Sequence, residues 1–242
     1  MLKHFRQACY LPCFDFKGRV AYGHLVTHGT INMTIVQVLN SITRRVPAWL
    51  LYIVLVLPGL WLFYKAVNNQ LGADPLKVLE FQLGVYSLQL MVAALLITPL
   101  REMLGVNLTK YRRAIGLMAF FYALAHLTTY LWLDQQWWWG AIYKDLTKRP
   151  YIIIGMLAFL ALVPLAMTSN NYSIRRLGPV FWKKLQRLAY FAAMGGAVHY
   201  VLLEKTWQQE PILYVLGVSL LLGYRFVPGL KGRLGFFRRV EG

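Results

Sequence analysis

Long apolar stretches separated by short polar and charged segments are the main pattern of this 242-residue chain. A helix needs about 20 largely apolar residues to cross the ~30 Å hydrocarbon core of a membrane. Six stretches approach that length, and they cover residues 48–64, 83–100, 114–133, 151–169, 188–203 and 211–224. The last two are short, so we expect them to extend into their flanks. The pattern predicts an all-α integral membrane protein, folded as a six-helix bundle.

Composition supports the membrane class and excludes several others. Hydrophobic residues make up 58% of the chain and charged residues only 14%, with a mean hydropathy of +0.47. Soluble domains carry about a quarter charged residues. The net charge of +17 could suggest nucleic acid, but basic nucleic-acid binders are polar and this chain is not. An aromatic content of 15% excludes a disordered chain, and two cysteines are too few for a disulfide scaffold.

The distribution of basic residues predicts the orientation of the bundle. Twenty of the 26 lysines and arginines fall in the N-terminal segment 1–46, the second and fourth loops and the tail 226–242 with its helix end. The positive-inside rule therefore predicts that both termini are cytoplasmic, on either side of a transmembrane domain 47–225. The run Trp137, Trp138 and Trp139 is then expected at the outer interface. No signal peptide is expected, and Met33 is an alternative start that would shorten the N-terminal segment.

Two of the five histidines, His126 and His199, fall inside apolar stretches, where ionisable residues are rare and usually functional. His126 follows Arg113 by 13 residues and His199 follows Arg187 by 12, so both imidazoles are expected roughly 18–20 Å from the inner face. Two imidazoles at the same depth can bind one haem iron between two helices. For each histidine, a hydrogen bond to another helix is an alternative role. Zinc is less suited, because it usually takes four ligands.

Small residues on the same helix faces would make room for a macrocycle beside these histidines. They are Ala119 and Ala123 before His126, and Gly195 and Gly196 before His199. Small residues also serve plain helix packing in membranes, so this support is modest.

Several motifs resemble those of the haem-binding membrane subunits of bacterial periplasmic methionine sulfoxide reductase systems, within the ferric-reductase-like transmembrane superfamily. The resemblance runs from about residue 47 to 225. Its motifs are Gly72-Ala73-Asp74-Pro75, Thr98-Pro99-Leu100, Arg112-Arg113, His126-Leu127-Thr128, Arg149-Pro150-Tyr151, Arg176-Leu177-Gly178 and His199-Tyr200.

The resemblance implies a specific function. His126 and His199 would be the axial ligands of a b-type haem, and flavin mononucleotide (FMN) is a further cofactor associated with the family. Electrons would come from the quinone pool or a flavin on the inner side. They would pass to a separate periplasmic, molybdenum-containing reductase that repairs oxidised methionine, so this chain would itself carry no catalytic residue.

One position departs from the family pattern. Gln186 lies 13 residues before His199, where many relatives carry a histidine, and the position 14 before His126 is Arg112. Glutamine is a poor ligand for haem iron compared with those usually found. We therefore predict a single haem, in the outer leaflet.

Cationic residues near either face are candidates for binding cofactor anions through charge-assisted hydrogen bonds. On the inner side, the candidates for a flavin phosphate are Arg101, Lys110, Arg112, Arg113, Arg175 and Arg176. On the outer side, the candidates for haem propionates are Lys148, Arg149 and Lys205. Topology explains the inner charges equally well, and interfacial snorkelling explains the outer ones.

Other patterns add little to this prediction. Cys9, Cys13, His24 and His28 have a spacing near that of a zinc finger, but the central spacer is short and no ββα pattern surrounds them. No dinucleotide-binding glycine motif follows a strand, so the electron donor is expected to be external. Two alternatives stay open: a quinone- or flavin-fed metal-chelate reductase, and a non-redox transporter or assembly protein.

Overall fold

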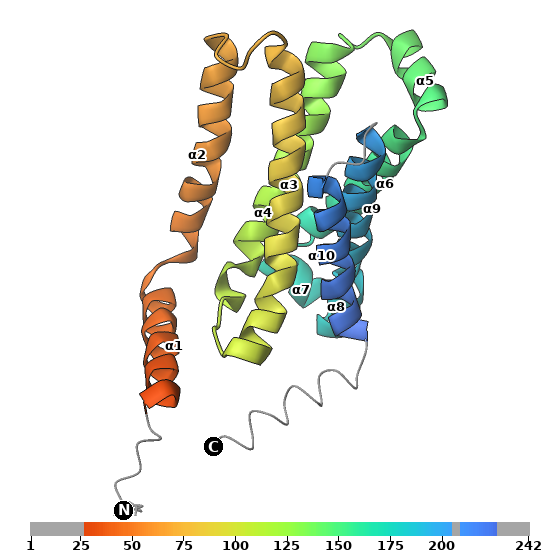
Figure 1. Cartoon of the computed structure of the whole chain (residues 1–242). Helices are drawn as coiled ribbons and strands as arrows, with labels where there is room; N and C mark the ends of the chain where they lie inside the picture. Colours follow the sequence, from red (N-terminus) through yellow and green to blue (C-terminus); the bar gives the residue numbers. More distant parts are fainter. Residues whose placement is uncertain (1–26, 205–208, 227–242) are drawn as a thin grey trace, which may run out of the picture.

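The computed structural model describes residues 27–204 and 209–226, with the backbone alone for 27–34. Its regular structure in these ranges is entirely helical, which confirms the all-α prediction. The six apolar stretches lie in α2 (Ala48–Val67), α3 (Pro75–Pro99), α4 (Arg112–Thr128), α6 (Pro150–Met167), α9 (Leu188–Leu203) and α10 (Gln209–Phe226) (Figure 1). Four helical segments in the described ranges are long and apolar enough to cross a membrane: Ala48–Val67, Pro75–Leu104, Thr109–Asp134 and Pro150–Met167.

Shorter helices connect or extend the long ones. They are α1 (Thr27–Arg45), α5 (Trp139–Lys148), α7 (Asn171–Leu177) and α8 (Pro179–Leu185), with a single 3₁₀ turn, η2 (Thr109–Tyr111). Two π-helical turns, η1 (Leu100–Leu104) and η3 (Thr129–Asp134), prolong α3 and α4. Cys9, Cys13, His24 and Lys205 lie outside the described residues, as does the side chain of His28.

Four helices, α3, α4, α6 and α9, form the centre of the bundle, with α3 packed on α4 and α6 packed on α9. Alanines at their contacts are almost completely buried: Ala114, Ala119, Ala192, Ala193 and Ala197. Such small side chains let helix backbones approach closely, which drives packing where lipid removes the hydrophobic contribution. The buried hydroxyl of Ser87 also donates a hydrogen bond of 2.9 Å from α3 to the carbonyl of Ala119 on α4.

Helix α2 lies at the edge of the bundle, beside α3 and α4 (Figure 1). Leu62 is its only buried residue. Pro58 interrupts its backbone hydrogen bonds, and the next rung is completed from another helix: the Tyr122 hydroxyl donates to the Leu55 carbonyl (2.6 Å) and accepts from the Gly59 N–H (3.0 Å). The Tyr122 side chain of α4 thus bonds both backbone groups next to the proline and attaches α2 to α4.

Side-chain hydrogen bonds hold two of the connections between helices in place. The carboxylate of Asp74 caps α3 by accepting from the backbone N–H of Lys77 (3.3 Å), and the Lys77 ammonium, which also bonds this carboxylate, lowers the pKa of Asp74. At the other end of the bundle, the side chain of Asn40 on α1 donates to the Gly105 carbonyl and accepts from the Asn107 N–H. Helix α1 is therefore fixed to the connection between α3 and α4.

Candidate functional site

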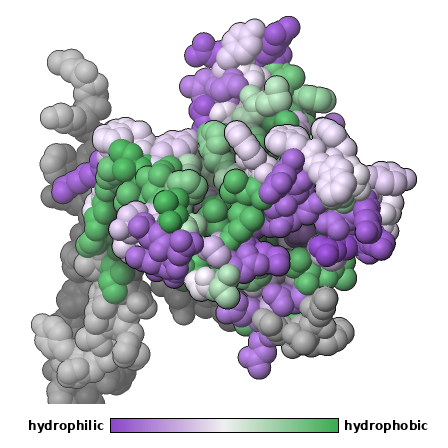
Figure 2. Space-filling model, turned by 90° about the horizontal axis from the view of Figure 1, so that it is seen from above, coloured by the Kyte–Doolittle hydropathy of each residue, from purple (hydrophilic) through white to green (hydrophobic). Residues whose placement is uncertain are grey.

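A cavity of about 660 Å³ lies between α3, α4, α6 and α9, and both buried histidines line it. Its walls are mainly apolar, with Leu88, Met91 and Phe159 among the lining residues. Sites for cofactors are typically concave, mostly apolar and of this size, with a few placed polar groups. The cavity lies towards the end of the bundle that carries α5, where hydrophilic and hydrophobic side chains are interspersed on the surface (Figure 2).

Each histidine is held by a backbone carbonyl on the helix that packs against its own. The Nδ1 of His126 lies 2.8 Å from the carbonyl oxygen of Glu80 on α3, and the Nδ1 of His199 lies 2.6 Å from that of Tyr151 on α6. A carbonyl can only accept, so each Nδ1 carries the hydrogen. In a neutral imidazole this leaves the Nε2 lone pair free to bind a metal, with the ring orientation fixed from behind.

The two imidazoles lie together in the cavity. Their ring centres are 6.4 Å apart, and their planes are inclined by 77°. With a metal–nitrogen distance of ~2.1 Å and a ring centre ~1.1 Å behind the nitrogen, two imidazoles on opposite sides of one metal have centres ~6.4 Å apart. The observed separation therefore suits two axial ligands of one metal ion.

The donor set limits what such a metal could be. Among the described residues, no group of three or more histidine, cysteine, aspartate or glutamate side chains could hold a metal ion. A metal between His126 and His199 would thus take its remaining ligands from a group other than these side chains. A planar macrocycle in a largely apolar cavity fits this requirement.

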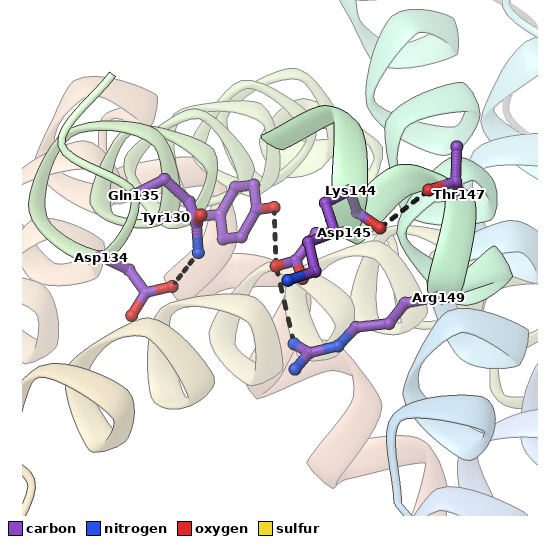
Figure 3. Close-up of polar contacts among 7 residues, drawn as sticks. All are labelled: Tyr130, Asp134, Gln135, Lys144, Asp145, Thr147 and Arg149. Carbon is purple, nitrogen blue, oxygen red and sulfur yellow. Dashed lines mark hydrogen bonds and ion pairs between the residues drawn. The ribbon is translucent and has the colours of Figure 1, made fainter. Parts of the chain in front are cut away.

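Charged residues form the rim of the cavity at the α5 end: Lys77, Glu80, Asp134, Arg149 and Glu204. The guanidinium of Arg149 lies 3.7 Å from the carboxylate of Asp145, which also accepts a hydrogen bond from the Tyr130 hydroxyl at 3.4 Å (Figure 3). Arg149 was one of the three outer cations predicted from the sequence, whereas Lys148 is not among the lining residues. Lys77 was missed, although it lies one turn before Glu80 on α3.

Glycines opposite the histidines were also missed from the sequence. Gly84 on α3 faces the His126 ring, and Gly155 on α6 faces the His199 ring. Of the small residues expected to make room, Ala123 and Gly196 line the cavity. Gly195 instead packs against Ala158, and Ala119 is buried where α4 meets α3. No signal in the sequence distinguishes Gly84 and Gly155 from packing glycines, because only the packing of α3 on α4 and of α6 on α9 brings them against the histidines.

The inner cations predicted to bind a phosphate gather at the opposite end of the bundle. Arg101 lies in η1, Arg112 and Arg113 begin α4, and Arg175 and Arg176 lie in α7. Arg113 donates to the side chain of Asn171 at 3.1 Å, which joins the start of α4 to α7.

Gln186 and Arg225 contribute further polar groups at this end. The Arg225 guanidinium donates to the Tyr190 hydroxyl (2.7 Å), the Leu95 carbonyl and the Thr98 hydroxyl (both 2.9 Å). The Nε2 of Gln186 is buried without a hydrogen-bond partner in the described structure.

Comparison with known proteins assigns this architecture to a family. Residues 83–197 match the family described as "Ferric reductase like transmembrane component". The chain is also 47% identical over 186 residues to the protein-methionine-sulfoxide reductase heme-binding subunits MsrQ of Brucella ovis, Brucella canis and Brucella abortus. These matches cover 76% of this chain and 84% of each relative. The chain belongs to the MsrQ family. The ferric-reductase-like region begins in α3 and ends in α9, so it contains α4 with His126, all of α6 and most of α3 and α9, and it ends two residues before His199.

Proposed function

We propose that this MsrQ-family chain is a membrane b-type cytochrome that relays electrons to a periplasmic, molybdenum-containing methionine sulfoxide reductase. The observation that carries the proposal is the pair His126 and His199, whose ring centres lie 6.4 Å apart in one cavity with each Nδ1 held by a backbone carbonyl. The printed name of the Brucella relatives supports haem binding and a reductase partner.

In this proposal His126 and His199 would hold one haem through their Nε2 atoms. Bound haem supplies a one-electron redox centre at this position. The carbonyls of Glu80 and Tyr151 orient the two ligands, and apolar residues such as Leu88 and Phe159 exclude water from the cavity. Two histidine ligands would suit electron transfer rather than binding of a substrate.

Cations at the rim are suited to pair with the haem propionates. Arg149 and Lys77 both line the cavity, and charge-assisted hydrogen bonds to carboxylates are among the strongest available to them. Lys148 and Lys205, the other outer cations predicted from the sequence, remain candidates for the same role.

The charge distribution supports an orientation in which electrons move outward. Six membrane spans with both termini in the cytoplasm would put the basic end of the bundle inside and the cavity nearer the periplasm. The chain would then be a multi-pass protein of the bacterial inner membrane. Its outer face would present the rim of the cavity to the soluble reductase.

A donor is needed at the inner end, and we propose the quinone pool or a flavin. FMN would find cations for its phosphate among Arg101, Arg112, Arg113, Arg175 and Arg176. The link between Arg113 and Asn171 supports this by bringing two of these cationic segments together.

We propose one haem rather than two. Gln186 and Arg112 occupy the positions at which an inner haem would need ligands. The Arg225 guanidinium, bonded to Tyr190 and Thr98, fills space between α3 and α9 at this end. The haem-to-protein ratio of the purified chain should be close to one, and a ratio near two would refute the single-haem assignment.

Electron transfer from the reduced chain to a purified periplasmic methionine sulfoxide reductase tests the function. We expect reduced b-type absorption bands that disappear when the reductase and a methionine sulfoxide substrate are added together, but persist with either alone. If the chain has no b-type bands, every redox assignment fails and a transporter or assembly role becomes the better explanation.

The ferric-reductase-like match favours one second candidate, a metal-chelate reductase fed by quinone or flavin. The same reduced chain mixed with a ferric chelate distinguishes the two candidates. Rapid reoxidation by the chelate, without reoxidation by the methionine sulfoxide reductase, would select this second function.

A further inference from the structure

The two histidine sites repeat one local arrangement on two helix pairs. The carbonyl that accepts from His126 belongs to Glu80, and Gly84 follows one helical turn later on α3. The carbonyl that accepts from His199 belongs to Tyr151, and Gly155 follows one turn later on α6. In each case the ring is held by the carbonyl and lies over the glycine.

Neither glycine could carry a side chain without displacing the ring. A Cβ at Gly155 would lie 2.7 Å from Nδ1 and 2.9 Å from Cε1 of His199. A Cβ at Gly84 would lie 3.2 Å from Nδ1 and 3.3 Å from Cε1 of His126. The contact at Gly155 is closer than real Cβ atoms allow, whereas the contact at Gly84 is only tight. A side chain at Gly155 should therefore displace its histidine more than a side chain at Gly84 would.

General helix packing does not explain these two glycines. Gly116 on α4 and Gly217 on α10 have open space where a Cβ would be, and Gly195 and Gly196 face Ala158 and the tip of Met91. Among the helical glycines of the described chain, only Gly84 and Gly155 have an imidazole against the missing side chain.

We propose that Gly84 and Gly155 are positioning residues that hold the two imidazole planes nearly perpendicular and so set the ligand field of the iron. The inference rests on the proposed haem binding. The observed angle between the planes is 77°. Each carbonyl fixes the direction of an Nδ1–H, and each glycine leaves space for the Nδ1 side of the ring against the neighbouring helix.

The angle between axial imidazole planes has a known electronic consequence. Perpendicular planes leave two iron d orbitals close in energy, which gives ferric low-spin haem a single, strongly anisotropic low-field signal in electron paramagnetic resonance (EPR). Parallel planes separate these orbitals and give a rhombic, three-line signal. Orientation of the axial ligands is thus a means by which the protein tunes its cofactor.

EPR spectra and redox titrations of the purified full-length chain test the proposal. The wild type should show the single low-field signal. Gly155→Ala should lose this signal in most of the haem, replaced by a rhombic or high-spin one, with a shifted midpoint potential. Gly84→Ala should show a smaller change of the same kind, because its contact is less severe. The matched controls Gly116→Ala and Gly217→Ala should keep both the wild-type signal and the wild-type potential.

Two results would overturn the proposal: a rhombic wild-type signal, or wild-type signal and potential in both Gly84→Ala and Gly155→Ala. If Gly155→Ala does not yield folded protein, Gly84→Ala and the wild-type spectrum decide the question. A wild-type chain without haem would instead refute the proposed function, whereas haem with a rhombic signal would refute only this inference.

Discussion

The four helices around the cavity and the peripheral helix α2 are held in the bundle by different means. Between α3, α4, α6 and α9, buried alanines and glycines bring backbones together, and backbone carbonyls bind the two histidines. Helix α2 presents large apolar side chains outward, with Leu62 as its only buried residue. Next to Pro58, its Leu55 carbonyl and its Gly59 N–H are both bonded by one hydroxyl, that of Tyr122.

This difference indicates that the histidine cavity and the edge helix α2 can be altered independently. The ferric-reductase-like match covers residues 83–197 and leaves out α2. Tyr122 nevertheless lies one turn before His126 on α4, so the two parts meet on a single helix. Substitutions on either side of this junction should affect either haem or stability, but rarely both.

Loss of either histidine should have the largest effect. Removing a partner behind a metal ligand typically weakens metal binding 10–100-fold, so His126→Ala or His199→Ala should reduce haem content at least roughly tenfold or leave it high-spin. Haem per protein and the optical spectrum measure this, with His28→Ala as the control. Unchanged low-spin spectra in both variants would refute the ligand assignment.

Removal of the Tyr122 hydroxyl should weaken the attachment of α2 and leave haem binding unchanged. Tyr122→Phe leaves the Leu55 carbonyl and the Gly59 N–H without their shared partner, which costs about 1–3 kcal/mol for a buried polar group. Thermal unfolding in detergent should show the loss, while the haem spectrum stays the same.

Tyr86→Phe is the matched control for that variant, because the Tyr86 ring packs edge-on against Tyr122 with centres 5.6 Å apart. Its unfolding temperature should stay near that of the wild type. Equal losses in the two variants would mean that loss of either hydroxyl destabilises the chain to the same extent, so that the bridge to Leu55 and Gly59 is not what anchors α2.

Substitution at the rim should have the smallest effect. Arg149→Gln removes a positive charge that lines the cavity, which favours the oxidised haem and lowers its midpoint potential. A half-exposed charge contributes about 1 kcal/mol or less, on the order of 40 mV for a one-electron couple. Lys144→Gln is the control, because Lys144 is an exposed cation of α5 that does not line the cavity. Equal shifts in both variants would indicate a diffuse surface effect and not a propionate contact.

Hydrophobic pattern predicted the long helices well and the short ones poorly. All six apolar stretches fall in helices, because a long run of apolar side chains can be found in the sequence without knowing what the helix packs against. The start of α3 is Pro75 and not residue 83, since Lys77 and Glu80 in its first turns interrupt the apolar pattern. Helix α5 was missed for the same reason, because its ten residues mix aromatic and charged side chains.

Spacing to the flanking arginines sufficed to predict that His126 and His199 lie near each other. Their partners could not be predicted in this way. The accepting groups are the backbone carbonyls of Glu80 and Tyr151, which every residue possesses, so sequence gives no sign of them. Only the packing of α3 on α4 and of α6 on α9 identifies which carbonyls are used.

The unequal lengths of the central helices have a consequence for the surrounding lipid. The segment Pro75–Leu104 has 30 residues, whereas α9 has 16 and would span only ~24 Å of a ~30 Å hydrocarbon core. A helix that is too short draws headgroups inward, so the bilayer should be thinner beside α9 than beside α3. His199 lies four residues from the end of α9, while His126 lies eight residues from the end of η3. In a bundle of six spans, hydrophobic mismatch would therefore bring water and headgroups closer to the His199 side of the cavity than to the His126 side.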